Sequence, residues 1–390
     1  MIIRKAIINN FSDALKLVKS VDCSSGVHKF LAEKGFIKPI VVEEIDNRAA
    51  NVLKQEAISV GADSIVSIDV SKFKYGTSNT VLFATINQIK KLISKLELQP
   101  FGLKKVALEL DKILSEKKVF RYADKYLDLS RPIVMGIINM DPNSFSGDGL
   151  TDSDKALRQA IEFEKLGAKM IDIGAESSRP GTDFIDAKTE IKRLVPALKK
   201  IRRDVCIPVS VDTYKYETAK AALDEGADIV NDIFALRRGR EKLAKLVADT
   251  KAGLILMHMK GIPKNMQMFP FYKNCTSEVY KFLMERKRYA VSFGISEECI
   301  AVDPGPGFGK NLEHNIELIK NISIFSSLGV VVGAVSRKKF IKTLAGDEDK
   351  TAFIAMNFLT ALSGANILRV HDVKETVNVL KIVEILQKLQ

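Results

Sequence analysis

The chain has 390 residues, of which 46% are hydrophobic and 28% charged, with 23 glycines and 11 prolines. This composition is ordinary for a globular protein and excludes collagen-like and disordered classes, while the length favours two unequal domains. The net charge of +12 is spread along the chain, so a basic solvated surface is favoured first, a phosphate-bearing small-molecule substrate second and nucleic acid last.

The four cysteines, Cys23, Cys206, Cys275 and Cys299, have spacings that fit neither a zinc site nor a redox motif. Free thiols are typical of a reducing cytosol. No apolar run approaches the ~18 residues of a membrane span, and the amino terminus has no apolar region of the signal-peptide type. We therefore expect a cytoplasmic protein without a membrane partner.

The sequence pattern of residues 1–120 predicts a separate, smaller α/β domain of unknown role. Strand-like runs are expected at 38–45, 64–70 and 80–85, and helices at 48–60, 87–98 and 103–117. The domain shows no catalytic constellation, and we interpret His28 and Cys23 as structural or incidental. The polar segment 121–131 ends at a proline and is interpreted as the linker to the second domain, residues 132–390.

From residue 132 onward, short apolar runs alternate eight times with longer amphipathic stretches. The runs are 132–140, 169–175, 208–212, 229–233, 253–257, 299–302, 330–335 and 367–370. Continuous apolar runs are typical of parallel strands that are covered on both faces. Eight strand–helix units in this length match a (β/α)8 TIM barrel, which usually needs about 250 residues. A doubly wound open sheet is the rival, but the chain lacks the G-x-G-x-x-G opening of that fold.

A TIM barrel carries its chemistry where the strands end. At these positions the chain offers two carboxylates, an amide and an ammonium, namely Asp212, Asn231, Asp303 and Lys338. Such a set suits a flat heterocycle with an amino-pyrimidinone edge, because carboxylates accept hydrogen bonds from adjacent N–H groups. A second set suits a diphosphate with Mg²⁺: Asn139, Arg179, Arg337, Arg369 and His371.

Structural alternatives stay open for several of these residues. Arg337 could pair with a neighbouring carboxylate, and Asp232 could cap the following helix. His258 and His314 lack zinc spacing and are interpreted as non-ligands. The glycine-rich stretch 305–311 superficially resembles a phosphate loop, but the spacing of that motif fails, and the stretch follows the sixth strand.

This set of motifs resembles dihydropteroate synthase, a pterin-binding TIM-barrel family of folate biosynthesis. The resemblance covers about 131–389 and rests on segments 135–149, 172–181, 210–213, 231–233, 256–261, 303–310, 336–338 and 369–373. It implies a transferase that condenses (7,8-dihydropterin-6-yl)methyl diphosphate with 4-aminobenzoate, giving 7,8-dihydropteroate and diphosphate. It also implies a homodimer and Mg²⁺ as cofactor.

The resemblance assigns roles residue by residue. It implies pterin contacts for Asp212, Asn231, Ile233, Met259, Asp303, Phe308 and Lys338, and diphosphate contacts for Asn139, Arg369 and His371, with Asn139 also a Mg²⁺ ligand. Asn139, Lys338, Arg369 and His371 are the implied catalytic residues. Loops 141–149 and 177–181 would close over the aminobenzoate, which Phe145, Ser178, Arg179, Pro180 and Lys339 would contact.

The chain departs from the family pattern on the aminobenzoate side. Residues 141–143 read Asp-Pro-Asn in place of Thr-Pro-Asp, and 146–149 read Ser-Gly-Asp-Gly in place of Ser-Asp-Gly-Gly. The seventh strand carries one extra residue, and Lys339 replaces the usual Ser. Two other classes remain as rivals: a methyltetrahydropterin:corrinoid methyltransferase, which would not need Arg369 or His371, and a non-enzymatic pterin-binding protein.

Overall fold

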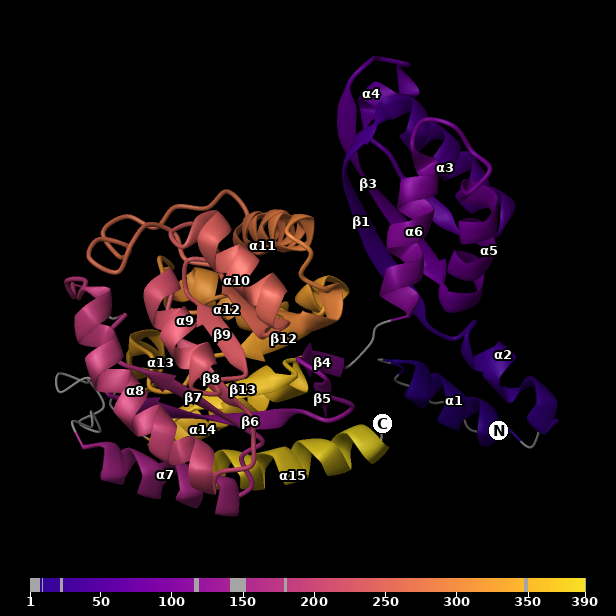
Figure 1. Ribbon diagram of the computed structural model, residues 1–390. Coiled ribbons are helices and arrows are strands. Elements are labelled where there is room, and N and C mark those ends of the chain that lie inside the picture. Colours follow the sequence, from indigo (N-terminus) through magenta and orange to yellow (C-terminus); the bar gives the residue numbers. More distant parts are fainter. Residues whose placement is uncertain are drawn as a thin grey trace. The chain divides into compact units, whose positions relative to one another are not determined.

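The structure is a computed structural model that describes residues 8, 10–21, 24–115, 119–140, 152–178, 181–346 and 350–389. The chain forms two compact units, one up to residue 116 and the other over residues 117–388. Each unit has its own helices and strands (Figure 1).

Eight parallel strands of the second unit close into a barrel (Figure 1). They are β6 (Ile133–Asn139), β7 (Met170–Gly174), β8 (Val209–Asp212), β9 (Ile229–Asp232), β10 (Gly253–Met257), β11 (Ile300–Asp303), β12 (Val330–Gly333) and β13 (Ile367–Val370). The strands follow one another around the barrel in chain order, and β13 pairs back onto β6. This confirms the predicted (β/α)8 barrel and its eight strands.

Amphipathic helices cover the barrel. They are α7 (Ser153–Lys165), α8 (Ala187–Asp204), α9 (Tyr216–Asp224), α10 (Arg240–Thr250), α11 (Cys275–Ser292), α12 (Leu312–Lys320), α13 (Lys339–Ala345), α14 (Lys350–Leu362) and α15 (Val373–Leu389). Helix and strand side chains form one buried layer that includes Ile171, Leu198 and Val302. Side-chain caps fix where helices begin: Asp186 accepts a hydrogen bond from the Thr189 N–H at 2.8 Å at the start of α8.

The segment 121–131, which we expected to be a linker, belongs largely to a β-hairpin. Strands β4 (Val119–Tyr122) and β5 (Lys125–Asp128) pair antiparallel. Phe120 is fully buried and packs with barrel residues such as Ile229 and Ile255. A Cβ added to Gly253, at the start of β10, would lie 3.0 Å from the Phe120 ring. The hairpin therefore covers the amino-terminal end of the barrel, because its apolar side chains complete the interior core there.

The first unit has a three-stranded antiparallel sheet in the order β1 (Ile37–Asp46), β3 (Thr77–Thr85), β2 (Asp63–Ile65). Its helices are α1 (Phe11–Lys19), α2 (His28–Ala32), α3 (Asn47–Ser59), α4 (Ile68–Ser71), α5 (Ile86–Leu96) and α6 (Leu103–Leu114). The strand expected over 64–70 is wrong in its second half. There Ser67 accepts a hydrogen bond from the Asp69 N–H at 3.3 Å and starts α4. This local cap competes with strand pairing.

Within the described residues, no helix combines the length and the apolar character that a membrane crossing requires.

Replacing Phe120 with Ala should destabilise the barrel unit, since it leaves a cavity among fully buried side chains. The expected loss in the free energy of unfolding is about 3–5 kcal/mol. Tyr126→Ala in the same hairpin is the matched control, because Tyr126 is 60% exposed, and it should change stability by less than about 0.5 kcal/mol. Urea denaturation followed by circular dichroism measures both variants, and equal losses would contradict the role of Phe120.

Candidate active site

The strand ends bring polar side chains to one rim of the barrel. Asn139 is the last residue of β6, Asp212 of β8 and Asp303 of β11, while Arg369 is the last but one of β13. Because all eight strands are parallel in a closed barrel, their carboxyl ends lie at the same end of the molecule. The predicted polar residues of these strands thus share one rim.

Arg369 is held between two carboxylates at this rim. Its Nε and Nη2 each lie 2.6 Å from Asp172 Oδ2, and Nη2 also lies 2.6 Å from Asp212 Oδ2. Asn231 donates from Nδ2 to the same Asp172 oxygen at 3.2 Å. Asp172 is not among the predicted site residues and lies fully buried in the middle of β7. A carboxylate inside an otherwise apolar strand was the signal that could have identified it.

The two carboxylates predicted to bind the pterin both lie in a desolvated environment. Burial raises the pKa of Asp212 to about 7, although Arg369 opposes the shift. Burial also raises the pKa of Asp303 to about 6, while the Gly305 N–H, which donates to Asp303 Oδ1 at 2.7 Å, opposes that shift. Ligand N–H groups that donate to these oxygens would favour their ionised form.

Lys338 lies within the electrostatic reach of the same carboxylates. Burial lowers its pKa to about 8, and the charge of Arg369 adds to the effect, whereas Asp303 and Asp212 oppose it. Its Nζ lies 4.1 Å from the centroid of the Phe308 ring. The structure therefore brings Lys338 together with the predicted pterin residues.

The predicted pocket walls also meet at this rim. Ile233, Met259 and Phe308 are 7%, 1% and 6% exposed and belong to one buried apolar cluster. The cluster also contains two aromatic side chains that the sequence analysis did not select, Tyr214 and Phe234, with ring centroids 4.8 Å apart. A flat ring bound at the carboxylates would thus have apolar side chains beside it.

Lys310 holds the loop after β11 in place through hydrogen bonds to its backbone. This buried ammonium donates to the carbonyl oxygens of Gly305 and Phe308 at 2.9 and 3.0 Å, and it lies 2.9 Å from His258 Nδ1. Burial lowers the pKa of His258 well below its usual value, which suits an accepting neutral imidazole. Lys310 thus serves its own loop, consistent with our rejection of a phosphate-loop interpretation, and His258 is engaged structurally.

Two glycines let this loop approach the end of β10 closely. Gly305 and Gly309 have φ angles of +65° and +64°. A Cβ on Gly305 would lie 2.0 Å from the His258 carbonyl oxygen, and one on Gly309 would lie 2.4 Å from that of Lys260. Any side chain at either position would displace backbone, so the loop geometry depends on glycine at both.

The structural alternative left open for Arg337 is confirmed, whereas the helix cap suggested for Asp232 is wrong, because Asp232 binds a turn that precedes α10 and the N-cap of that helix is Gly239. Arg337 pairs with Asp372, with Nη2 3.0 Å from Oδ1. Asp232 accepts backbone hydrogen bonds from Phe234 and Leu236 at 2.7 and 2.6 Å and so caps the turn after β9. Neither side chain is directed to a ligand by these contacts.

The remaining predicted residues are placed as follows. His371 Nδ1 lies 3.2 Å from Ser336 Oγ, which links the ends of β13 and β12. His314 completes a capping box with Asn311 at the start of α12. Lys339 is exposed at the first position of α13. Phe145, Arg179 and Pro180 lie outside the described residues, as do the departures at 141–143 and 146–149.

A small open pocket lies beside this rim. Its walls include Asp212 and Ile233 from the predicted pterin set and Ser178 from the predicted aminobenzoate set, together with Glu176 and Tyr214. In the part of the chain that the structure describes, no group of three or more His, Cys, Asp or Glu side chains could hold a metal ion.

Comparison with known proteins gives a consistent result. The family described as pterin-binding enzymes matches residues 135–371. A bifunctional dihydropteroate synthase/dihydropteroate reductase from Helicobacter pylori is 34% identical over 91% of this chain and 92% of its own length. A dihydropteroate synthase from Escherichia coli is 39% identical over 66% of this chain and 93% of its own length. A solved dihydropteroate synthase from Xanthomonas albilineans, with 4-aminobenzoic acid, is 34% identical, with a TM-score of 0.64 over 70% of this chain and 98% of that chain.

The stability of Asp212→Asn relative to the ligand-free parent should rise with pH, whatever the pH-independent cost of losing the pair with Arg369. A carboxyl group whose pKa is raised on folding favours its protonated form in the folded state, so its ionisation costs stability between its unfolded pKa, near 4, and its folded pKa, about 7. Asn does not ionise. The difference in the free energy of unfolding should therefore grow by about 2 kcal/mol between pH 5 and pH 8. Urea denaturation at four pH values measures it, and a constant difference would contradict the assignment.

Proposed function

Since the chain belongs to the family of pterin-binding enzymes, we propose that its barrel condenses (7,8-dihydropterin-6-yl)methyl diphosphate with 4-aminobenzoate, giving 7,8-dihydropteroate and diphosphate. This is the activity of a dihydropteroate synthase, a transferase of folate biosynthesis. The observation that carries the proposal is the charged rim: two buried carboxylates, Asp212 and Asp303, lie with Lys338 and Arg369 beside an apolar wall.

Asp212 and Asp303 have the chemistry to hold the pterin edge. Each presents carboxylate oxygens to adjacent ring and amino N–H groups, and Asn231 can supply an amide. Lys338 would donate to a ring acceptor, and Phe308 and Met259 would pack against the faces of the ring. Since these groups are buried, a ligand that leaves one of them unpaired would bind weakly, which favours a pterin over other flat heterocycles.

The reaction requires the enzyme to stabilise departing negative charge. The bond from the exocyclic methylene to the diphosphate oxygen breaks with its electron pair on oxygen, leaving a cation that the pterin ring delocalises. The amine of 4-aminobenzoate then attacks this carbon and loses a proton. Arg369 and His371 have the donors to hold the diphosphate as its charge develops. The loop that contains Ser177 and Ser178 would hold the aminobenzoate and exclude water.

Mg²⁺ is the cofactor that we propose for the diphosphate. This ion prefers oxygen ligands and is commonly held by one or two protein groups together with phosphates and water. The amide oxygen of Asn139, half-buried at the end of β6, fits that donor chemistry. When bound, Mg²⁺ would neutralise charge on the diphosphate. From the same family resemblance we also propose that the enzyme acts in the cytoplasm as a homodimer.

A second activity, dihydropteroate reduction, is favoured by the H. pylori relative. That bifunctional enzyme aligns over 91% of this chain, so the similarity includes the first unit, whereas the E. coli synthase covers 66%. Such a reduction would require a hydride donor of the nicotinamide or flavin class, which would supply hydride for C6 of 7,8-dihydropteroate while a proton goes to N5. The full chain, incubated with dihydropteroate, NADPH and flavin, should then form tetrahydropteroate. Absence of this product, with the synthase activity present, would rule the second activity out.

The primary test measures diphosphate release from the pterin diphosphate with and without 4-aminobenzoate. Release should depend on 4-aminobenzoate, and Asp303→Ala should weaken pterin binding in calorimetry by about 1–3 kcal/mol or more while the fold is retained. Pterin binding without turnover would favour the non-enzymatic alternative, and methyl transfer from methyltetrahydropterin to a corrinoid would favour the methyltransferase. Unchanged pterin affinity in the variant would remove Asp303 from the site.

Lys339→Ser should weaken the use of 4-aminobenzoate specifically. An exposed ammonium that pairs with the carboxylate of the substrate contributes modestly, so KM for 4-aminobenzoate should rise about two- to fivefold at low salt. KM for the pterin diphosphate should stay unchanged. The effect should shrink as salt rises, because screening weakens an ion pair. Identical KM values for parent and variant across a salt series would show that Lys339 does not contact the substrate.

A further inference from the structure

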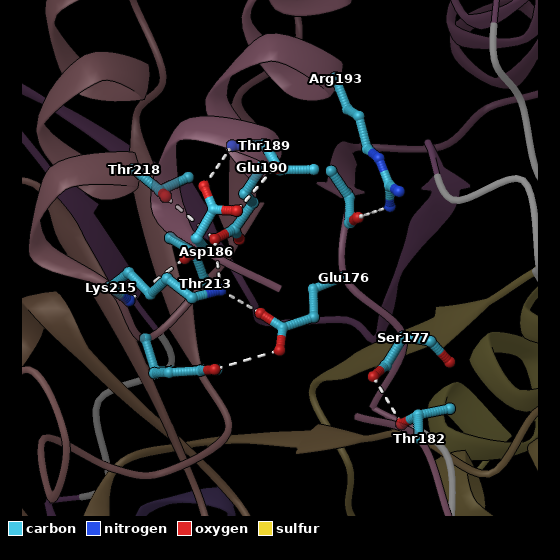
Figure 2. Close-up of polar contacts among 12 residues, drawn as sticks. Glu176, Ser177, Thr182, Asp186, Thr189, Glu190, Arg193, Thr213, Lys215 and Thr218 are labelled. Atoms are coloured by element: carbon cyan, nitrogen blue, oxygen red, sulfur yellow. Dashed lines mark hydrogen bonds and ion pairs between the residues drawn. The ribbon is translucent and has the colours of Figure 1, made fainter. Parts of the chain in front are cut away.

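A buried ion cluster lies beside the rim and outside the residues assigned above. Lys215, the residue before α9, forms ion pairs with Glu176 and with Glu190, whose Oε2 lies 2.7 Å from Nζ (Figure 2). The exposed fractions of the three side chains are 13% for Lys215, 9% for Glu176 and 1% for Glu190. Two carboxylates and one ammonium are thus packed together with little contact with water.

The cluster joins three separate elements. Glu176 follows β7, Glu190 lies in the first turn of α8, and Lys215 lies between β8 and α9. Glu190 is also bound from α9, because Thr218 Oγ1 donates to its Oε2 at 2.9 Å. Tyr214 donates from its hydroxyl to Glu176 Oε1 at 3.1 Å. Lys215 is the shared partner, so its removal would leave two carboxylates close together in a buried site.

Fold stability alone gives a weak reason for such a cluster. Burying charges has a large desolvation cost, and apolar side chains of similar volume often support a fold equally well. In addition, Glu190 Oε1 has no hydrogen-bond partner among the described residues. A cluster that holds charge at this cost is better explained by a need for exact placement of the groups that it contacts.

The group that the cluster holds is the start of the loop after β7. Glu176 directly precedes Ser177 and Ser178, which line the pocket with Asp212. The neighbouring backbone is held by two further contacts: Arg193 of α8 donates to the Ala175 carbonyl at 3.2 Å, and Thr182 donates to the Ser177 carbonyl at 2.9 Å (Figure 2). The ion pair to Lys215, together with the hydrogen bond from Tyr214, ties this loop to the segment that follows the strand carrying Asp212.

We propose that Lys215 is a positioning residue of the condensation, which holds Glu176 so that the loop at Ser177 and Ser178 presents 4-aminobenzoate to the pterin carbon. This inference rests on the proposed function. Lys215 contacts neither substrate itself and acts through Glu176. The residues proposed to bind the pterin and the loop at Ser177 and Ser178 come from different elements. Loss of the ion pair between Lys215 and Glu176 should therefore affect the binding of the two substrates unequally.

The test compares Lys215→Met with Lys215→Arg and with Lys220→Met. Lys220 is the matched control, since it lies on α9, the helix that follows Lys215, and forms an exposed ion pair with Asp224. Lys215→Met should raise KM for 4-aminobenzoate about tenfold or more, since small displacements of bound reactants are costly, and change KM for the pterin diphosphate less than about threefold. Lys215→Arg should recover part of the loss, and Lys220→Met should match the parent.

Several outcomes would overturn this role. Equal changes in both KM values, or none, would make the cluster purely structural, as would a failure of Lys215→Arg to recover any loss. If Lys215→Met does not fold, Glu176→Gln takes its place: it keeps the shape and weakens only the ion pair, and it should raise KM for 4-aminobenzoate selectively. Absence of diphosphate release in the parent itself would refute the proposed function and this inference together, whereas an active parent with unaffected variants would refute the inference alone.

Discussion

The pairing of Arg369 with two carboxylates is the interaction on which the rim depends. Three strands contribute to it: β13 supplies Arg369, β7 supplies Asp172 and β8 supplies Asp212. A buried charge without a partner costs several kcal/mol, so each of the three groups makes the burial of the others tolerable. Asp172 in turn fixes Asn231 through the bond that it accepts. A ligand that reaches Asp212 therefore meets donors and acceptors whose positions are already set.

Two further sets of contacts hold the loops that lie near this pairing. Lys310 hydrogen-bonds the carbonyl oxygen of Phe308 in the loop after β11, and the Phe308 ring lies beside Lys338. The cluster around Lys215 holds the start of the loop after β7 through its ion pair with Glu176. Both use a buried ammonium that binds groups of the protein itself. Preorganised groups of this kind need little rearrangement when charge develops in a reaction, which suits the departure of a diphosphate.

The sequence predicted the barrel and most of its rim because both follow from local patterns. Continuous apolar runs identify buried parallel strands, and the residues that end them must share one rim. Asp172 was missed because its role depends on a partner, Arg369, almost two hundred residues away in the chain. The hairpin that contains Phe120 was missed because the polar character of segment 121–131 suggested a linker. The core that its apolar residues enter is formed by the barrel strands, which are distant in the sequence. The strand expected over 64–70 failed because the cap at Ser67 outweighed strand propensity.

The most direct measurement of the central claim is a crystal structure of the full chain with the pterin diphosphate bound. The account predicts that the amino-pyrimidinone edge lies on Asp212 and Asp303, that the ring packs beside Phe308, and that the diphosphate reaches Arg369 and His371. A pterin bound away from this rim, or a diphosphate directed away from Arg369 and His371, would contradict it.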